Sequence, residues 1–263
     1  MMKVNIGVIG GGNMGSAIVS GIRKKYDVAV CEQDRKRRQW LKRRYKVMTG
    51  GLNTIAQMSK VIILAVKPQD FDSVLKELKL YLIGNPLVIS VAAGITCRYI
   101  EKRLGSKTRV IRTMPNLPAH IGRGITGICA GKAAKKKDVI LAQKLFSCVG
   151  KTIVVDEKYM DAVTAASGSG PAYVFLFMES LQKAVRSLGL KDSLAKMLVM
   201  QTVKGSLDLM EQRKEDASVL RARVTSKGGT TQAAMEVFER NKIGQIFLKA
   251  LAAAGKRAKE LSK

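Results

Sequence analysis

A glycine-rich turn between a short apolar strand and a helix constrains the fold of this chain more than any other feature. The run Val4–Ile9 is followed by Gly10-Gly11-Gly12-Asn13-Met14-Gly15 and then by the helix-forming stretch Ser16–Val19. In this G-x-G-x-x-G pattern the glycines allow a tight turn, a close approach to a pyrophosphate and close helix–strand packing. Because a helix N-terminus offers free N–H groups to an anion, the pattern predicts a βαβ unit that binds a dinucleotide.

The end of the second expected strand, Val28–Cys31, carries two signals about the dinucleotide. Glu32 follows Gly15 at about the distance at which an acid binds the adenosine ribose diol of NAD. Arg35, with Arg37 and Arg38 close behind it, is placed to hold the 2′-phosphate of NADP instead. Because the two signals conflict, the sequence predicts NADPH or NADH without choosing between them.

The N-terminal part alternates short β-branched runs with amphipathic stretches, which indicates βαβ units and a mainly parallel sheet. After Asp161 only helical periodicity remains. The predicted fold is therefore α/β: a Rossmann-type doubly wound sheet over residues 1–158, followed by an all-α domain over residues 159–263. The further expected strands are Val61–Ala65, Leu87–Val91, Thr108–Ile111, Gly124–Ala130 and Thr152–Val155. The expected helices include Asn13–Lys24, Arg35–Arg44, Ala134–Cys148, Pro171–Leu188, Ser193–Glu211, Ser218–Arg223, Gln232–Arg240 and Ile243–Leu261.

The helix expected at Pro171–Leu188 is apolar on every side around Tyr173–Met178. Such a helix is normally buried all round, and about 100 residues of helix supply little else to enclose it. We therefore expect a second copy of the chain to cover it. Ser169 is the expected N-cap of this helix.

Composition excludes several classes of protein. With 46% hydrophobic residues the chain is not a disordered basic tail, and its apolar runs are too short to span a membrane. No secretory signal precedes the first strand, and four cysteines without a CxxC pair fit free thiols in a reducing compartment, so we expect a cytoplasmic protein. The formal charge of +27 raises the possibility of a nucleic-acid partner.

The counts of His and Cys argue against metal and triad chemistry. His120 is the single histidine, and none of the cysteines stands at metal-ligand spacing from another. No GxSxG motif accompanies His120. The sequence therefore predicts no metal site and no hydrolytic triad.

Three further motifs complete a family pattern. They are Ala65-Val66-Lys67-Pro68-Gln69 at a strand end, Arg112-Thr113-Met114-Pro115-Asn116-Leu117-Pro118, and, in the helical part, Ser167-Gly168-Ser169-Gly170-Pro171-Ala172-Tyr173 with Val224-Thr225-Ser226-Lys227-Gly228-Gly229-Thr230-Thr231. Together with the glycine-rich turn, and in this order over nearly the whole chain, they resemble pyrroline-5-carboxylate reductase. The resemblance implies reduction of the C=N bond of 1-pyrroline-5-carboxylate to L-proline with NADPH or NADH. It also implies a homodimer through the helical domain, with a ring of five dimers as one form.

The resemblance also implies roles for individual residues. Thr231 would be catalytic, with its hydroxyl near the ring nitrogen. The substrate carboxylate would be bound by the loop residues Ser226, Gly228, Gly229, Thr230 and Thr231. The cofactor would be bound by Gly10, Gly12, Asn13, Met14, Gly15, Glu32, Arg35, Ala65, Val66, Lys67, Pro68, Ala92, Ala93 and Gly94.

The residue types suit this reaction. Because a cyclic imine has a basic nitrogen, its reduction needs no strong acid from the enzyme. It needs the nicotinamide and the imine carbon to be held close together, and such positioning can lower the barrier by roughly 7–11 kcal/mol. A glycine-rich loop can bind a carboxylate through backbone N–H groups. Two positions depart from the family: Lys227 replaces the usual proline, and Leu52 stands where an adenosine-binding Asn is usual, with Asn53 one step away. Because lysine is easily solvated, we expect the Lys227 change to be neutral.

Two other functions compete with this interpretation. A β-hydroxyacid dehydrogenase of the 6-phosphogluconate type would need a catalytic lysine in the helical part, but no lysine occurs from Tyr159 through Gln182. A nucleic-acid-binding protein would explain the charge, yet no nucleic-acid-binding motif appears and aromatic residues are only 5%. The sequence therefore argues against nucleic acid as the partner.

Overall fold

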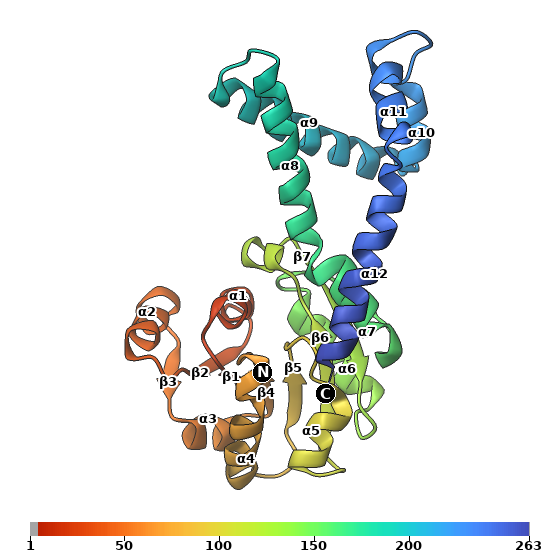
Figure 1. Ribbon diagram of the computed structural model, residues 1–263. Helices are drawn as coiled ribbons and strands as arrows, with labels where there is room; N and C mark the ends of the chain where they lie inside the picture. Colours follow the sequence, from red (N-terminus) through yellow and green to blue (C-terminus); the bar gives the residue numbers. More distant parts are fainter. Residues whose placement is uncertain (1–4, 263) are drawn as a thin grey trace. The chain divides into compact units, whose positions relative to one another are not determined.

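The structure is a computed structural model that describes residues 5–262, so Val4 of the first expected strand lies outside the described residues. The chain divides into two compact units (Figure 1). The first unit runs as far as Pro171 and takes up the chain again from Ala254, and the second unit comprises Ala172–Ala253. Each unit is described by itself below.

The first unit contains one sheet in the order β3-β2-β1-β4-β5-β6-β7-β8. All neighbouring strands are parallel except β6 and β7, which are antiparallel. The runs of Val and Ile that form β4 and β5 are buried throughout, as expected for a sheet covered on both faces. The strands are β1 (Asn5–Ile9), β2 (Asp27–Cys31), β3 (Met48–Gly50), β4 (Val61–Leu64), β5 (Leu87–Ser90), β6 (Arg109–Met114), β7 (Gly124–Ala130) and β8 (Gly150–Val154).

Helices cover both faces of this sheet and create two apolar cores. One core holds α1 (Asn13–Ile22), α2 (Arg35–Tyr45) and α6 (Lys136–Phe146). The other holds α3 (Leu52–Met58), α4 (Phe71–Tyr81) and α5 (Cys97–Leu104). Within β4, Ile63 enters the first core and Ile62 the second, because successive strand residues point to opposite faces.

The strand order reverses direction between β1 and β4. In a doubly wound sheet, ligands bind at such a point, beside the carboxyl ends of the strands. The glycine-rich turn follows β1, and Ala65 follows β4 directly. The fold thus brings two predicted cofactor segments to one edge of the sheet.

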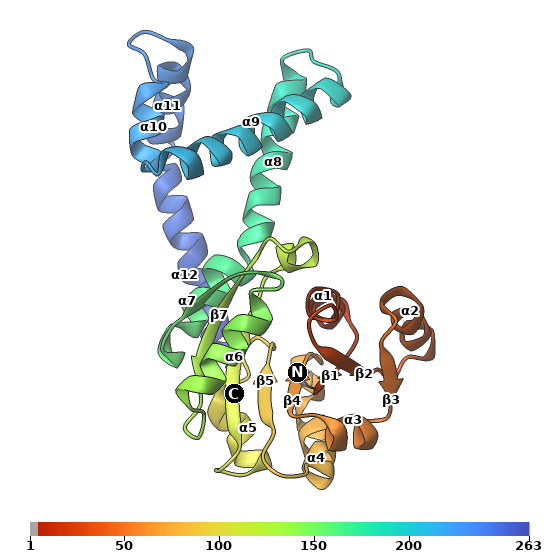
Figure 2. The same cartoon turned by 180° about the vertical axis from the view of Figure 1, so that it is seen from behind.

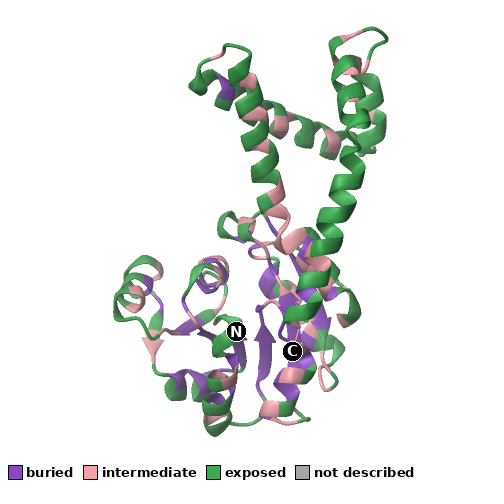
Figure 3. Cartoon of the chain, viewed as in Figure 1, coloured by how far each residue is buried: buried purple, intermediate pink, exposed green. Residues whose placement is uncertain are grey.

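The helical part begins with α7 (Met160–Val163) and a π-helical turn over Thr164–Gly168, which leads into α8 (Gly170–Ser187). Ser169 has helical dihedral angles and directly precedes α8. The remaining helices are α9 (Asp192–Arg213), α10 (Ala217–Arg223), α11 (Thr230–Arg240) and α12 (Ile243–Leu261). Most residues of α8 to α11 are exposed in the single chain (Figure 3).

The α/β fold predicted from the sequence is confirmed: each expected strand and helix has a counterpart whose ends differ by a few residues. The sheet lies in the N-terminal part and, among the described residues, only helices follow Asp161 (Figure 2). The expectations did not include β3, a strand of three residues at the sheet edge. Within residues 5–262, no helix combines the length and apolar character needed to cross a membrane.

Candidate functional site

The glycine-rich turn has a backbone that only glycine adopts easily. Gly10 has φ +99° and donates its N–H to the carbonyl oxygen of Cys31 at 2.8 Å. A Cβ at Gly10 would lie 2.7 Å from the carbonyl oxygen of Ala65, and a Cβ at Gly15 would collide with the carbonyl oxygen of Gly10. These two glycines therefore close the turn and seat α1 against the sheet.

Gly12 has the opposite surroundings. Among the described residues, no heavy atom lies within 4 Å of the place a Cβ would take at Gly12. Gly12 is the N-cap of α1, and no side chain of the described chain caps that helix. The first turn of α1, which includes Asn13 and Met14, thus has uncapped N–H groups next to an open position at Gly12, an arrangement that fits a pyrophosphate.

Glu32 is fixed beside this turn by backbone donors. Its carboxylate accepts the N–H of Gly11 at 2.8 Å and that of Asp34 at 2.9 Å. Asp34 in turn caps α2 by accepting the N–H of Arg37 at 2.6 Å. The carboxylate therefore stands at the end of β2, where an acid binds ribose hydroxyls in NAD-binding folds.

Of the three arginines after β2 that could hold a 2′-phosphate, Arg38 alone lines the cavity beside the glycine-rich turn. Arg37 donates through Nε to the carbonyl oxygen of Gly11 at 2.8 Å and through Nη2 to Ser16 Oγ at 3.0 Å. Arg38 lines the cavity beside Glu32, whereas Arg35 is exposed and does not line it. Arg38 is thus the one of these three arginines that lines the candidate cofactor cavity.

This cavity has a volume of about 490 Å³ and lies at the carboxyl ends of β1, β2, β3 and β4. Among the predicted cofactor residues it is lined by Gly10, Gly12, Glu32, Ala65, Val66 and Lys67. Sequence reasoning missed other lining residues, among them Gly50, Gly51, Asp70, Ser73 and Glu77. Gly50 and Gly51 directly precede Leu52, which also lines the cavity and stands where the family usually has its adenosine-binding Asn.

The remaining predicted cofactor residues of the first unit lie outside this cavity lining. Pro68 begins a short 3₁₀ turn after Lys67. Ala92, Ala93 and Gly94 follow β5, the next strand along the sheet edge. Gly94 has φ +74°, and a Cβ there would lie 2.5 Å from the carbonyl oxygen of Leu261, in the returning end of α12.

The predicted substrate loop belongs to the second unit. The N–H of Gly229 donates to the carbonyl oxygen of Ser226 at 3.1 Å, and Gly228 has φ +72°, a pattern typical of a type II turn. The N–H of Gly228 donates to Gln232 Oε1 at 2.7 Å. The N–H groups of Thr230 and Thr231, in the first turn of α11, therefore remain as the donors for an anion.

Comparison with known proteins identifies both parts of the chain. Residues 157–261 match the family model for pyrroline-5-carboxylate reductase dimerisation. Residues 5–94 match the model described as NADP oxidoreductase, coenzyme F420-dependent. The first match covers the helical part and the second covers the glycine-rich turn and β1 to β5.

Full-length relatives agree with these matches. The pyrroline-5-carboxylate reductase of Synechocystis is 39% identical over the whole of both chains. A solved pyrroline-5-carboxylate reductase from Coxiella burnetii is 40% identical, with a TM-score of 0.92 over 99% of each chain. The Plasmodium falciparum enzyme, solved with NADP bound, is 31% identical, with a TM-score of 0.90 over the whole of both chains. With this identity along its full length, the chain belongs to the pyrroline-5-carboxylate reductase family.

Proposed function

We propose that the protein reduces 1-pyrroline-5-carboxylate to L-proline, the last step of proline biosynthesis, with NADPH or NADH as the electron donor. The observation that carries the proposal is the full-length similarity to reductases of this name, in a chain whose Gly12 leaves the start of α1 open to an anion. The family model matched by residues 5–94 supports a nicotinamide cofactor. Bound to the first unit, the reduced cofactor supplies a hydride to the imine carbon.

Residues of the first unit would hold the cofactor. The first turn of α1 would bind the pyrophosphate, and Glu32 or Arg38 would meet the adenosine ribose. Ala65, Val66, Lys67 and the Ala92–Gly94 turn would flank the nicotinamide, because they follow β4 and β5 at the same edge of the sheet. We assign this role to the domain at residues 1–158.

The second unit would hold the substrate. The N–H groups of Thr230 and Thr231 would bind the carboxylate, with the macrodipole of α11 adding to the attraction. The Thr231 hydroxyl would lie near the ring nitrogen and donate a hydrogen bond as that nitrogen takes up a proton. We assign this role and dimerisation to residues 159–263, in agreement with the family model that matches residues 157–261.

We infer that two copies of the chain pair through the helices of the second unit. In the single chain Val174, Phe175, Leu176 and Phe177 are 48–63% exposed, although α8 is apolar on every side around Tyr173–Met178. Exposed apolar surface of this extent is typical of a protein–protein interface. A homodimer, assembled further into a ring of five dimers and working in the cytoplasm, is the form we propose.

The first test is a direct assay. Purified protein is mixed with 1-pyrroline-5-carboxylate and either NADH or NADPH, and the loss of reduced-nicotinamide absorbance is followed while proline is measured independently. Turnover with at least one cofactor is expected. A folded protein that turns over neither would refute the proposed reaction.

Thr231 is tested by Thr231→Ala, with Thr230→Ser as the matched control that keeps a hydroxyl in the same turn. If the Thr231 hydroxyl assists the imine nitrogen, kcat/KM falls by more than ~10-fold, a loss of at least ~1.4 kcal/mol of transition-state stabilisation. Thr231→Ser is expected to restore most of the activity. Unchanged kcat/KM in Thr231→Ala would show that the hydroxyl has no part in the reaction.

A further inference from the structure

We propose that Cys97, Cys129 and Glu157 form a site for a thiophilic divalent cation, of which Zn²⁺ is the type. Their two sulfur atoms and a carboxylate oxygen all lie within 4.8 Å of one another. The residues are far apart in the sequence, and the fold brings them together from α5, β7 and the 3₁₀ turn Glu157–Tyr159. Two thiolates and one carboxylate, with a water as the fourth ligand, make a donor set that suits tetrahedral Zn²⁺.

Secondary structure holds the three ligands in place. Cys97 is the first residue of α5, and its N–H donates to Glu157 Oε1 at 2.8 Å. Arg112 Nη1 lies 3.4 Å from the same oxygen. Both of these contacts use Oε1 of Glu157. Cys129 lies within β7, paired with Arg112 in β6.

Burial and charge balance are compatible with a cation at this place. Cys97 and Cys129 are 2% and 1% exposed. When a divalent cation binds and each thiol loses its proton, the net charge of the cluster stays the same, and Arg112 still compensates Glu157.

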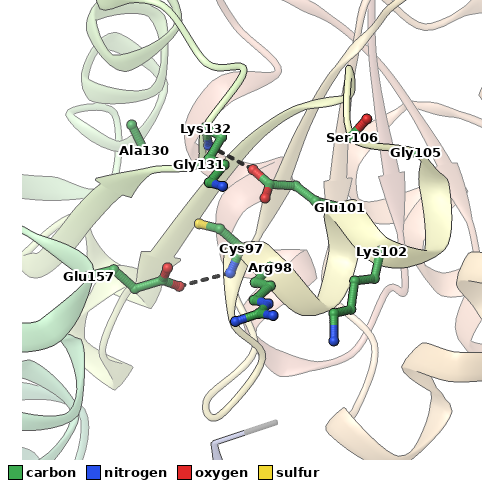
Figure 4. A pocket seen from close by; sticks show the side chains of 10 residues that line it. All are labelled: Cys97, Arg98, Glu101, Lys102, Gly105, Ser106, Ala130, Gly131, Lys132 and Glu157. Atoms are coloured by element: carbon green, nitrogen blue, oxygen red, sulfur yellow. Dashed lines mark hydrogen bonds between the residues drawn. The ribbon is translucent and has the colours of Figure 1, made fainter.

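Two cavities border the cluster. Cys97 and Glu157 line a cavity of about 670 Å³ between α5 and the end of β7 (Figure 4). Cys129 and Glu157 line a second cavity of about 530 Å³. Each cavity has room for the water that would complete the ligand set.

The site would tie three elements of the first unit together. α5 begins at Cys97, shortly after the Ala92–Gly94 turn, while β7 and Glu157 come from the far end of the sheet. A bound cation would thus stabilise the folded first unit by mass action, in proportion to the logarithm of its concentration. This role is independent of the reductase reaction.

The proposal is tested with Co²⁺ as a spectroscopic probe on the reduced full-length protein. One equivalent of Co²⁺ per chain should bind with a thiolate-to-cobalt charge-transfer band, and Zn²⁺ should abolish the band by displacing Co²⁺. The band should disappear in Cys97→Ser and in Cys129→Ser. It should persist in Cys31→Ser and Cys148→Ser, which remove the two half-buried cysteines outside the cluster.

A second measurement keeps the test valid if a variant folds poorly. Zn²⁺ should raise the Tm of the wild-type protein, with a far smaller effect on Cys129→Ser, each compared with its own metal-free Tm. The proposal is overturned if the wild type shows no charge-transfer band, or if the band survives in folded Cys97→Ser. A Cys97–Cys129 disulfide in the air-exposed protein, found by peptide mass spectrometry without any binding of Co²⁺ or Zn²⁺ to the reduced form, would also overturn it.

Discussion

Two backbone N–H groups hold the Glu32 carboxylate at the end of β2, where we expect the adenosine ribose of a dinucleotide to bind. The carboxylate accepts the N–H groups of Gly11 and Asp34, which hold it in place in the cavity that Arg38 also lines. A fixed negative charge favours ribose hydroxyls over a 2′-phosphate. We therefore expect the choice between NADH and NADPH to depend on Glu32 and Arg38.

We expect Glu32→Gln to raise the affinity for NADPH relative to NADH by at least ~10-fold, or ~1.4 kcal/mol. The measurement is the Kd of each reduced cofactor by its fluorescence. Asp72→Asn removes one negative charge outside the cavity and should leave the ratio unchanged. An unchanged ratio in Glu32→Gln would assign cofactor choice to other residues.

Lys227 occupies the second position of the turn from Ser226 to Gly229, with Gly228 at the third position. Proline is favoured at the second position of a type II turn because it fixes φ there. Lys227→Pro should therefore stabilise the protein by roughly 0.4–1 kcal/mol, mainly by restricting the unfolded chain.

Because Lys227 is exposed, Lys227→Pro should leave the KM for 1-pyrroline-5-carboxylate unchanged. Thermal unfolding and steady-state kinetics check the two expectations, with Lys227→Ala as the control for loss of charge alone. A raised KM in both variants would mean that the lysine contacts the substrate.

At the scale of elements, the turn between β1 and α1 contains one glycine that packing requires, Gly15, and one that we expect cofactor binding to require, Gly12. Gly15→Ala would drive a methyl group against the carbonyl oxygen of Gly10, whereas the methyl of Gly12→Ala would enter open space. We expect Gly15→Ala to lower the free energy of unfolding by about 1–3 kcal/mol.

Gly12→Ala should fold nearly as well as the wild type but bind NADH at least ~10-fold more weakly, since its methyl would occupy the approach to the pyrophosphate. Thermal unfolding and cofactor titration of both variants provide the measurement. Wild-type cofactor affinity in Gly12→Ala would show that the pyrophosphate lies elsewhere.

Elements with a strong periodic pattern could be predicted from the sequence, whereas the side chains that meet between elements could not. The buried runs of β4 and β5 and the length of α12 are visible in the chain itself. Arg38, rather than Arg35, reaches the cavity because Leu41 is the buried residue of α2, and Arg37 and Arg38 lie one turn before it on the same face. Which face of α2 is buried depends on how the helix packs against the folded sheet, so the sequence of α2 alone does not show it.

The cysteine cluster shows the same limit more sharply. Spacing along the chain gave no reason to join Cys97, Cys129 and Glu157, because the usual metal motifs place ligands within one loop or helix turn. Here the proposed ligands come together only through the order of β5, β6, β7 and β8 in the sheet. Sites assembled across strands depend on topology and register, which no local pattern records.

At the scale of the whole molecule, the exposed apolar face of α8 predicts that the chain does not work alone. Leu176 is 63% exposed in the single chain. Leu176→Glu would bury a charge in the proposed dimer interface, which costs several kcal/mol. Sedimentation velocity should show a smaller species than the wild type.

Leu80→Glu is the matched control, because Leu80 is a 76% exposed leucine on α4 in the first unit. This variant should keep the size of the wild-type assembly. A wild-type protein that sediments as a monomer at micromolar concentration would contradict the dimer itself.

The return of α12 to the first unit has a consequence for the order in which the protein is made. The turn at Gly94 packs against Leu261, and Asp161 accepts a hydrogen bond from Ser262 at 3.0 Å. The ribosome adds this returning segment only after the whole of the second unit, on the order of ten seconds after Gly94 at usual elongation rates. The turn at Gly94, beside the candidate nicotinamide position, therefore stays uncovered on the nascent chain. It can be covered only after α8 to α12 have been synthesised.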